Sequence, residues 1–190
     1  MSMRKAAIIV ETRPLNNLFE IIEAHMIHLK GWDCILYDDE KINSPEDYNR
    51  LLTNPKFWDI EYDKVLIFQH DSGILKKGAD EFLDWDYVGS PWKNTASWAR
   101  HDRAGGNGGL SIRDVKAHQK LLSEKSYHPK YGNEDVFFTH YLPNVAPYQV
   151  CQRFACETEY QLGTIGYHAI DKHLSVSECL NIKMQYIPTN

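Results

Sequence analysis

Short runs of apolar residues alternate with amphipathic segments along the first part of the chain. Residues 6–10 form a short continuous apolar run, which is typical of a strand buried in a parallel sheet. A second strand is predicted over residues 32–37 and a third over residues 64–69. Apolar residues recur at helical spacing over residues 17–30, and Gly31 is a typical helix stop. Ser44 and Pro45 predict the start of a second helix that ends at Leu52. Strands that alternate with helices predict an α/β fold with a parallel sheet.

The second half of the chain has a less regular pattern. A helix is predicted from Asp114 to Ser123, and two acids precede the apolar segment Val136–Phe138. The residues after His173 have only a weak pattern and allow no placement. A length of 190 residues without internal repeats or an obvious linker predicts one domain over residues 1–190.

Composition and charge narrow the class of protein. Hydrophobic residues make up 43% and charged residues 25% of the chain, as in ordinary globular proteins. A net charge of −5 argues against general binding to nucleic acids or anionic membranes. The apolar run at residues 6–10 is too short for a transmembrane segment or a signal peptide. The four cysteines include no Cys-x-x-Cys pair, so we expect reduced thiols in a cytoplasmic protein.

Polar residues follow the predicted strands directly. In open α/β sheets, ligands bind outside the carboxyl ends of the strands. The candidate ligand-binding segments are therefore residues 11–13, 38–40 and 69–72. Asp71 in the last segment is a hard oxygen ligand of the kind that magnesium or manganese prefers. Alternatively, Asp71, Ser72 and Gly73 form an ordinary turn.

A glycine cluster is the next candidate. Four of the five residues from Gly105 to Gly109 are glycines, so this backbone can approach a ligand without interference from side chains. Arg100, Arg103 and Arg113 add positive charge nearby. The cluster lacks the spacing of a P-loop or a dinucleotide fingerprint. We therefore expect either a loop that binds a phosphate or a sugar, or a flexible turn.

The last candidates are acids and a histidine. Glu134 and Asp135 open an apolar segment, where one carboxylate could accept a proton from a sugar hydroxyl as a general base. Acids in the first turn of a helix are also ordinary partners of the helix dipole. His168 follows Gly166 and Tyr167, and it is either a metal ligand or a structural histidine.

Together these motifs resemble the GT-A glycosyltransferase-like domains. The resemblance rests on six segments between about residue 8 and residue 168: Val10–Arg13, Phe68–Ser72, Tyr87–Trp92, Gly106–Arg113, Asn133–Phe138 and Gly166–His168. It implies a Rossmann-like fold of the nucleotide-diphospho-sugar transferase type, with a mainly parallel central sheet flanked by helices.

The resemblance also implies roles for individual residues. Gln69, His70 and Asp71 match the family's Asp-x-Asp metal motif, in which Gln69 replaces the first aspartate. Asp71 and His168 match the ligands of a divalent metal, Mn²⁺ or Mg²⁺. Asp135 matches the catalytic base of inverting members, with Glu134 beside it. The expected donor-binding residues are Glu11, Thr12, Arg13, Asp38, Gln69, His70, Gly106, Asn107, Gly108 and Gly109.

The implied activity is that of a metal-dependent, inverting glycosyltransferase of the hexosyltransferase type. The expected partners are a nucleotide sugar, with UDP as the expected nucleotide, and a hydroxyl of a glycan or glycoprotein acceptor. The family includes viral members that build capsid glycans, for which the location would be the host cytoplasm and the chain one module of a longer protein. Two alternatives stay open: a non-catalytic module that binds nucleotide sugars or glycans, which Gln69 favours, and a nucleotide-sugar hydrolase.

Overall fold

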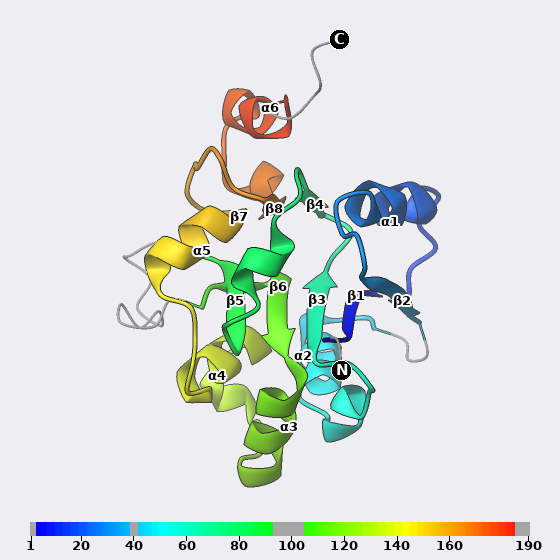
Figure 1. The fold of residues 1–190 in the computed structure, drawn as a ribbon, viewed down its shortest axis with the longest axis vertical. Helices are drawn as coiled ribbons and strands as arrows, with labels where there is room; N and C mark the ends of the chain where they lie inside the picture. The colour runs from blue at the N-terminus through cyan, green and yellow to red at the C-terminus, as the bar shows by residue number, and fades with distance from the viewer. Residues whose placement is uncertain (1–2, 39–41, 93–104, 185–190) are drawn as a thin grey trace.

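The computed structural model describes residues 3–38, 42–92 and 105–184. Arg100, Arg103 and residues 39–40 of the second strand-end segment lie outside these ranges. Within them, the centre of the molecule is a five-stranded sheet with the order β2-β1-β3-β6-β5 (Figure 1). Its strands are β1 (Lys5–Val10), β2 (Asp33–Tyr37), β3 (Lys64–Phe68), β5 (Tyr87–Ser90) and β6 (Asn107–Asp114).

Most strands of this sheet run in the same direction, but β6 is reversed. The strand β1 pairs in parallel with β2 and β3, whereas β6 pairs antiparallel with both β3 and β5. The expected mainly parallel sheet is therefore confirmed, with parallel pairing among the first three strands along the chain, whereas β6 was not predicted as a strand. The reversal has a local consequence, because β6 begins at the edge of the sheet where β1 and β3 end.

The two faces of the sheet pack against different helices. Ile9 and Phe68 point into one core, with α1 (Leu18–Met26), η2 (Ala79–Phe82) and α5 (Tyr148–Phe154). Their chain neighbours Ile8 and Ile67 point into the other core, with α2 (Pro45–Leu52), η1 (Pro55–Trp58), α3 (Val115–Glu124) and α4 (Glu134–Tyr141). This alternation explains why β1 and β3 are continuous apolar runs, since both faces of these strands are buried.

Local signals set the helix boundaries. The Ser44 hydroxyl accepts a hydrogen bond from the Asp47 amide at 3.1 Å, and the Asp114 carboxylate accepts one from the Ala117 amide at 2.8 Å. Both residues are N-caps, so the predicted starts of α2 and α3 are confirmed. The helix α1 ends at Met26, earlier than expected, because the following residues form tight turns that lead to Gly31, whose φ is +82°.

A second, smaller sheet lies beyond the carboxyl end of β3. It has the order β4-β8-β7, with β4 (Ser72–Ile74), β8 (Gly166–His168) and β7 (Ala155–Cys156). Antiparallel pairing of β4 with β8 places His168 opposite Ser72. The short helices η3 (Pro129–Tyr131) and η4 (Ile170–Lys172) and the helix α6 (Val176–Met184) complete the described fold. The weakly patterned tail thus contains α6, at the top of Figure 1.

The glycine cluster is not a loop throughout. Gly108 and Gly109 belong to β6, and only Gly105 and Gly106 precede the strand, with φ of +51° and +87°. A Cβ on Gly106 would lie 2.1 Å from the Ser90 carbonyl oxygen, so glycine allows β5 and β6 to approach each other at a register shift. The expectation of a flexible turn is wrong for the strand residues, because sheet pairing fixes their backbone.

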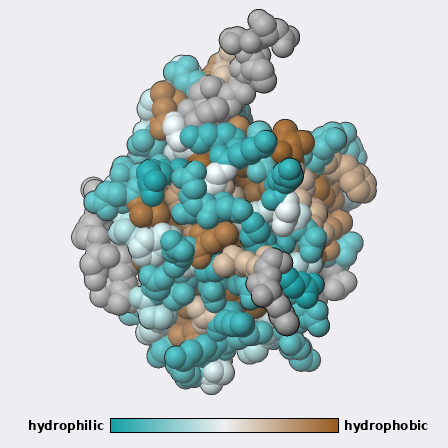
Figure 2. Space-filling model, in the orientation of Figure 1, coloured by the Kyte–Doolittle hydropathy of each residue, from teal (hydrophilic) through white to brown (hydrophobic). Residues whose placement is uncertain are grey.

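The face of the molecule in Figure 2 is mostly hydrophilic, with small separate apolar areas. None of the helices in the described ranges has the length and apolar character needed to span a bilayer.

Candidate functional site

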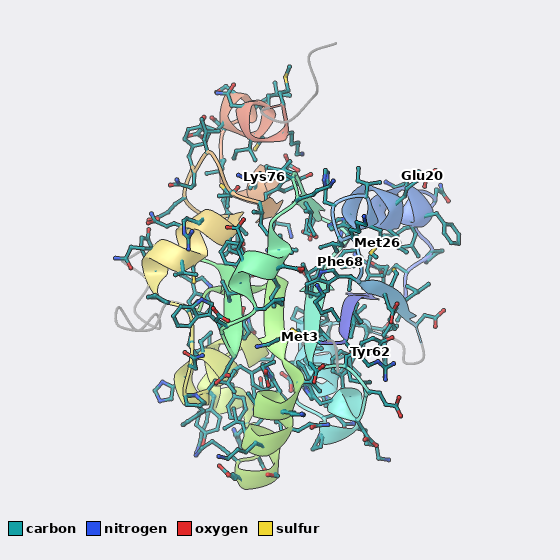
Figure 3. The ribbon with its side chains drawn as sticks, viewed as in Figure 1. Met3, Glu20, Met26, Tyr62, Phe68 and Lys76 are labelled. Carbon is teal, nitrogen blue, oxygen red and sulfur yellow. The ribbon has the colours of Figure 1, made fainter. Side chains whose placement is uncertain are left out.

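A cavity of about 410 Å³ opens at the edge of the sheet where β1 and β3 end and β6 begins. Phe68, labelled in Figure 3, marks this end of β3, and Tyr62 lies just before its start. Many residues singled out from the sequence line this cavity: Glu11, Thr12, Arg13, Gln69, His70, Asn107, Gly108, Gly109, Glu134, Asp135 and His168. Segments that are far apart in the chain are thus brought to one place.

Three of the expected site residues are not among the lining residues. Asp71 lies beside the cavity, where its Oδ1 is 3.3 Å from His168 Nε2. Gly106 packs against the backbone of Ser90 and so contributes to the packing of the sheet. Asp38 is exposed after β2, which is the edge strand and is separated from β3 by β1.

Glu11, Arg13 and His70 form one wall of the cavity. Glu11 Oε1 accepts hydrogen bonds from the amide and Nε of Arg13 at 2.9 and 2.8 Å, and Oε2 accepts from Arg13 Nη2 at 2.6 Å. Burial alone would raise the pKa of Glu11, but these hydrogen bonds outweigh it and lower the pKa. The Arg13 side chain is 56% exposed, and its Nη2 also lies 2.8 Å from His70 Nδ1. A guanidinium held in this way can bind an anionic group.

His168 is the centre of a second charged group beyond the carboxyl end of β3. Its Nε2 lies 3.0 Å from Gln69 Oε1, and its Nδ1 lies 3.2 Å from Glu157 Oε1. Burial opposes the charged imidazolium, but Asp71 and Glu157 outweigh it and raise the pKa of His168 to about 9. Asp71 also accepts a hydrogen bond from Lys172 Nζ at 2.7 Å. Burial would raise the pKa of Asp71, yet His168 and Lys172 together hold it well below its usual range.

The donor set around Asp71 is suited to a divalent cation. Asp71 Oδ1 is buried and has no hydrogen-bond partner among the described residues. His168 Nε2 lies 3.3 Å from this oxygen and 3.0 Å from Gln69 Oε1. A carboxylate, an imidazole that has released its proton and an amide oxygen together suit Mn²⁺ or Mg²⁺. Three or more His, Cys, Asp or Glu side chains do not gather into a metal-binding group anywhere in the described ranges. A cation here would therefore need further oxygen ligands from a substrate or from water.

Asp135 lies at the start of α4 on the opposite side of the cavity. Its Oδ2 accepts a hydrogen bond from the Gly108 amide at 3.1 Å, and its Oδ1 accepts one from the Val136 amide at 2.7 Å. Burial, reinforced by the neighbouring charge of Glu134, raises the pKa of Asp135 to about 7, although both amides oppose this shift. A carboxylate with this pKa can accept a proton near neutral pH.

Glu134 is engaged in a buried ion pair. Its Oε2 accepts from Arg113 Nη1 at 2.6 Å, and its Oε1 accepts from Arg113 Nη2 at 2.9 Å. Arg113 Nε donates to the Ser111 hydroxyl at 2.9 Å, and the Arg113 side chain is fully buried. The expectation that Arg113 offers positive charge to a ligand is therefore wrong, because Glu134 neutralises it inside the protein. Glu134 in turn holds the start of α4 against β6.

Several residues around the site were missed by sequence reasoning. Asn49 of α2 lines the cavity, and its Oδ1 accepts a hydrogen bond from the Glu134 amide at 3.0 Å. Tyr48 and Asn133 also line the cavity, and Lys172 and Glu157 surround the pair of Asp71 and His168. Asn133 was visible inside a motif, but the others depend on contacts between distant segments and have no local signal.

Comparisons with solved structures place the fold among known ones. A glycosyltransferase involved in the glycosylation of the major capsid of the virus PBCV-1 has a TM-score of 0.54 and 12% sequence identity, and the match covers 87% of this chain and 94% of that chain. GlyE of Streptococcus pneumoniae TIGR4, in its apo form, has a TM-score of 0.48 and 14% identity, over 92% of this chain and 55% of that chain. The first similarity shows a fold shared with a glycosyltransferase.

Sequence comparisons give a family but no activity. No curated protein matches the chain. The family model for a protein of unknown function, DUF5672, matches residues 31–169, which include most of the cavity lining and all of the second sheet. The chain therefore belongs to the DUF5672 family.

Proposed function

We propose that this protein is a GT-A type glycosyltransferase that moves a sugar from a nucleotide sugar to a hydroxyl group of a glycan. The observation that supports this most is the arrangement of one cavity. Asp135, with a pKa of about 7, lies on one side, and the group formed by Gln69, Asp71 and His168 lies at the end of β3. The fold shared with the PBCV-1 capsid glycosyltransferase agrees with this proposal.

In the proposed reaction, Asp135 acts on the acceptor. Its carboxylate takes the proton of the acceptor hydroxyl while that oxygen forms a bond to the anomeric carbon of the donor sugar. The bond between this carbon and the diphosphate oxygen breaks, and the nucleoside diphosphate leaves with the electron pair. A single displacement of this kind inverts the configuration at the anomeric carbon. Glu134 positions Asp135 through its ion pair with Arg113 and does not itself take the proton.

The other end of the cavity accommodates the donor. Asp71 and His168, with Gln69 beside them, would hold a divalent cation, Mn²⁺ or Mg²⁺, which offsets the negative charge of the leaving diphosphate when it is bound. The exposed Arg13 guanidinium would bind a phosphate oxygen. Residues along the cavity would contact the rest of the donor: Glu11, Thr12, His70, Asn107, Gly108 and Gly109. Gly106 would shape the start of β6. Asp38 would contact the donor only if part of the donor extends past β2.

We further propose UDP as the nucleotide and a glycan or glycoprotein as the acceptor. The PBCV-1 enzyme acts in glycosylation of a major capsid protein, and a similar role for this chain in the cytoplasm of a host cell is part of the proposal. The chain would act as one domain over residues 1–190.

The proposal is tested by separating donor binding from turnover in Asp135→Asn. We expect this variant to bind the donor within about twofold of the wild type and to lose transfer by about 100-fold or more, since it cannot accept the proton. Wild-type turnover should rise with pH through about 7, as Asp135 loses its proton. Glu124→Gln, which changes an exposed acid at the end of α3, serves as the control. Near-normal transfer by Asp135→Asn would contradict the proposal.

A non-catalytic module that binds nucleotide sugars is the second candidate. Gln69 favours it, because an amide stands where a catalytic GT-A site has an aspartate. Donor binding without transfer by the wild type, over a broad panel of glycan acceptors, would favour this candidate. Release of free sugar at a rate that no acceptor changes would instead indicate a nucleotide-sugar hydrolase.

A further inference from the structure

Tyr48 lines the cavity and has a buried hydroxyl group that makes no hydrogen bond within the described part of the chain. The residue lies on α2. A buried hydroxyl without a partner is unfavourable, so such groups usually have a partner in the functional state of a protein. For Tyr48, this partner would have to come from the contents of the cavity.

Most polar groups around Tyr48 are engaged with other atoms, and the nearby Gln69 side chain makes no hydrogen bond to Tyr48 Oη. Both oxygens of Glu134 accept hydrogen bonds from Arg113. Both oxygens of Asp135 accept hydrogen bonds from backbone amides. Gln69 Oε1 contacts His168 Nε2. Burial, reinforced by Glu134, raises the pKa of Tyr48, although Arg113 and Gln69 oppose this shift. The hydroxyl therefore keeps its proton at neutral pH and can donate a hydrogen bond.

The position of Tyr48 indicates which part of a substrate it would meet. Gln69 and Asp135 are both near enough to Tyr48 to affect its pKa. Gln69 contacts His168 at the end of the cavity proposed for the diphosphate. Asp135 is the proposed base. The sugar ring of the donor must lie between these groups, because its anomeric carbon is joined to the diphosphate and is attacked by the activated hydroxyl. Sugar rings offer hydroxyl groups, and a neutral phenol is a suitable partner for them.

We propose that the Tyr48 hydroxyl donates a hydrogen bond to a hydroxyl group of the donor's sugar ring, and that this contact makes the site prefer a nucleotide sugar over the free nucleotide. This inference rests on the proposed function.

Tyr48→Phe tests this contact, and Tyr87→Phe is the matched control. The Tyr87 hydroxyl is also buried without a hydrogen-bond partner in the described part of the chain, but Tyr87 is not among the residues that line the cavity. Each substitution removes one oxygen that makes no hydrogen bond in the fold. We therefore expect both variants to unfold at the wild-type urea midpoint or above it.

Binding is measured by calorimetry with Mn²⁺ present. The probes are UDP, UDP-glucose, UDP-galactose, UDP-N-acetylglucosamine, GDP and GDP-mannose. In Tyr48→Phe, we expect the affinity for the nucleotide sugar that the wild type prefers to fall about 5- to 10-fold, as for loss of one hydrogen bond between neutral groups. The affinity of the parent nucleotide should change by less than about twofold, and Tyr87→Phe should bind both ligands as the wild type does.

The outcomes separate this inference from the proposed function. Wild-type protein that binds none of the probes would overturn both. If the wild type binds a nucleotide sugar and Tyr48→Phe binds it equally well, the contact with Tyr48 is wrong and the proposed function stands. An equal loss of affinity in Tyr48→Phe and Tyr87→Phe would also contradict the contact. So would a loss of affinity in Tyr48→Phe that is equal for the nucleotide sugar and its parent nucleotide.

Discussion

The surroundings of Asp135 shift its pKa in opposite directions. Burial and the adjacent Glu134 favour the protonated acid, whereas the amides of Gly108 and Val136 favour the carboxylate. The balance leaves a pKa of about 7. A buried acid with this pKa exchanges its proton near neutral pH, which a general base requires, but its charge in the native state has a cost in stability.

This cost predicts how stability depends on pH. The pKa of Asp135 is about 7 in the folded protein against an ordinary value of 3.8, so the folded state binds a proton that the unfolded state has lost between these values. Stability should therefore fall as pH rises from about 4 to about 7, by roughly 2–4 kcal/mol from this residue alone. In Asp135→Asn this decrease in stability should be absent. Urea unfolding of both proteins at several pH values measures the free energy of unfolding.

The other titrating groups are the same in both proteins, so the difference between the two curves isolates Asp135. Parallel curves over this pH range would show that Asp135 has an ordinary pKa in the folded protein.

At the scale of elements, the site depends on how α2, α4 and β6 pack. The N-cap residue of α4, Asn133, makes no side-chain capping bond. Instead, Asn49 of α2 accepts a hydrogen bond from the Glu134 amide and donates one to Asn133 Oδ1 at 3.3 Å. The ion pair between Arg113 and Glu134 fixes the same end of α4 to β6. The position of Asp135 is thus set from two neighbouring elements.

Asn49→Ala should therefore destabilise the protein by about 1–2 kcal/mol, because it leaves a buried amide of α4 without its acceptor. Asn54→Ala is the matched control, since Asn54 caps η1 by accepting from the Lys56 amide at 3.0 Å and does not line the cavity. The control should lose less stability, because its amide is exposed to water. Urea unfolding measures both changes. A loss in Asn49→Ala no larger than in Asn54→Ala would contradict the capping role.

The sequence predicted those helices and strands that have a local sequence signal, such as an apolar run or a helix cap. The strands β1, β2 and β3 follow from apolar runs, and α2 and α3 begin at the caps Ser44 and Asp114. The direction of β6 could not be predicted in this way, because it depends on pairing of Phe68 with Leu110 and on the close approach of Gly106 to Ser90. These contacts join distant parts of the chain, and composition does not encode them.

For the whole molecule, the candidate site is an assembly of distant segments. The strand-end rule placed Glu11, Arg13 and Gln69 at one edge, and the structure agrees. The small sheet then brings His168 to Gln69 across 99 residues of chain, and η4 brings Lys172 to Asp71 across 101. Tyr48, Asn49 and Lys172 could not be assigned from the sequence, because their roles exist only after this packing.

The central claim is that one cavity binds a nucleotide sugar together with a divalent cation. Calorimetric titration with UDP, GDP and their sugars, once with Mn²⁺ and once with EDTA, tests it most directly. We expect binding of one nucleotide class that needs Mn²⁺ and that weakens about tenfold or more in Asp71→Ala, since this change removes the charged ligand that we propose for the cation. Absence of nucleotide binding under both conditions, or binding that neither EDTA nor Asp71→Ala alters, would contradict the claim.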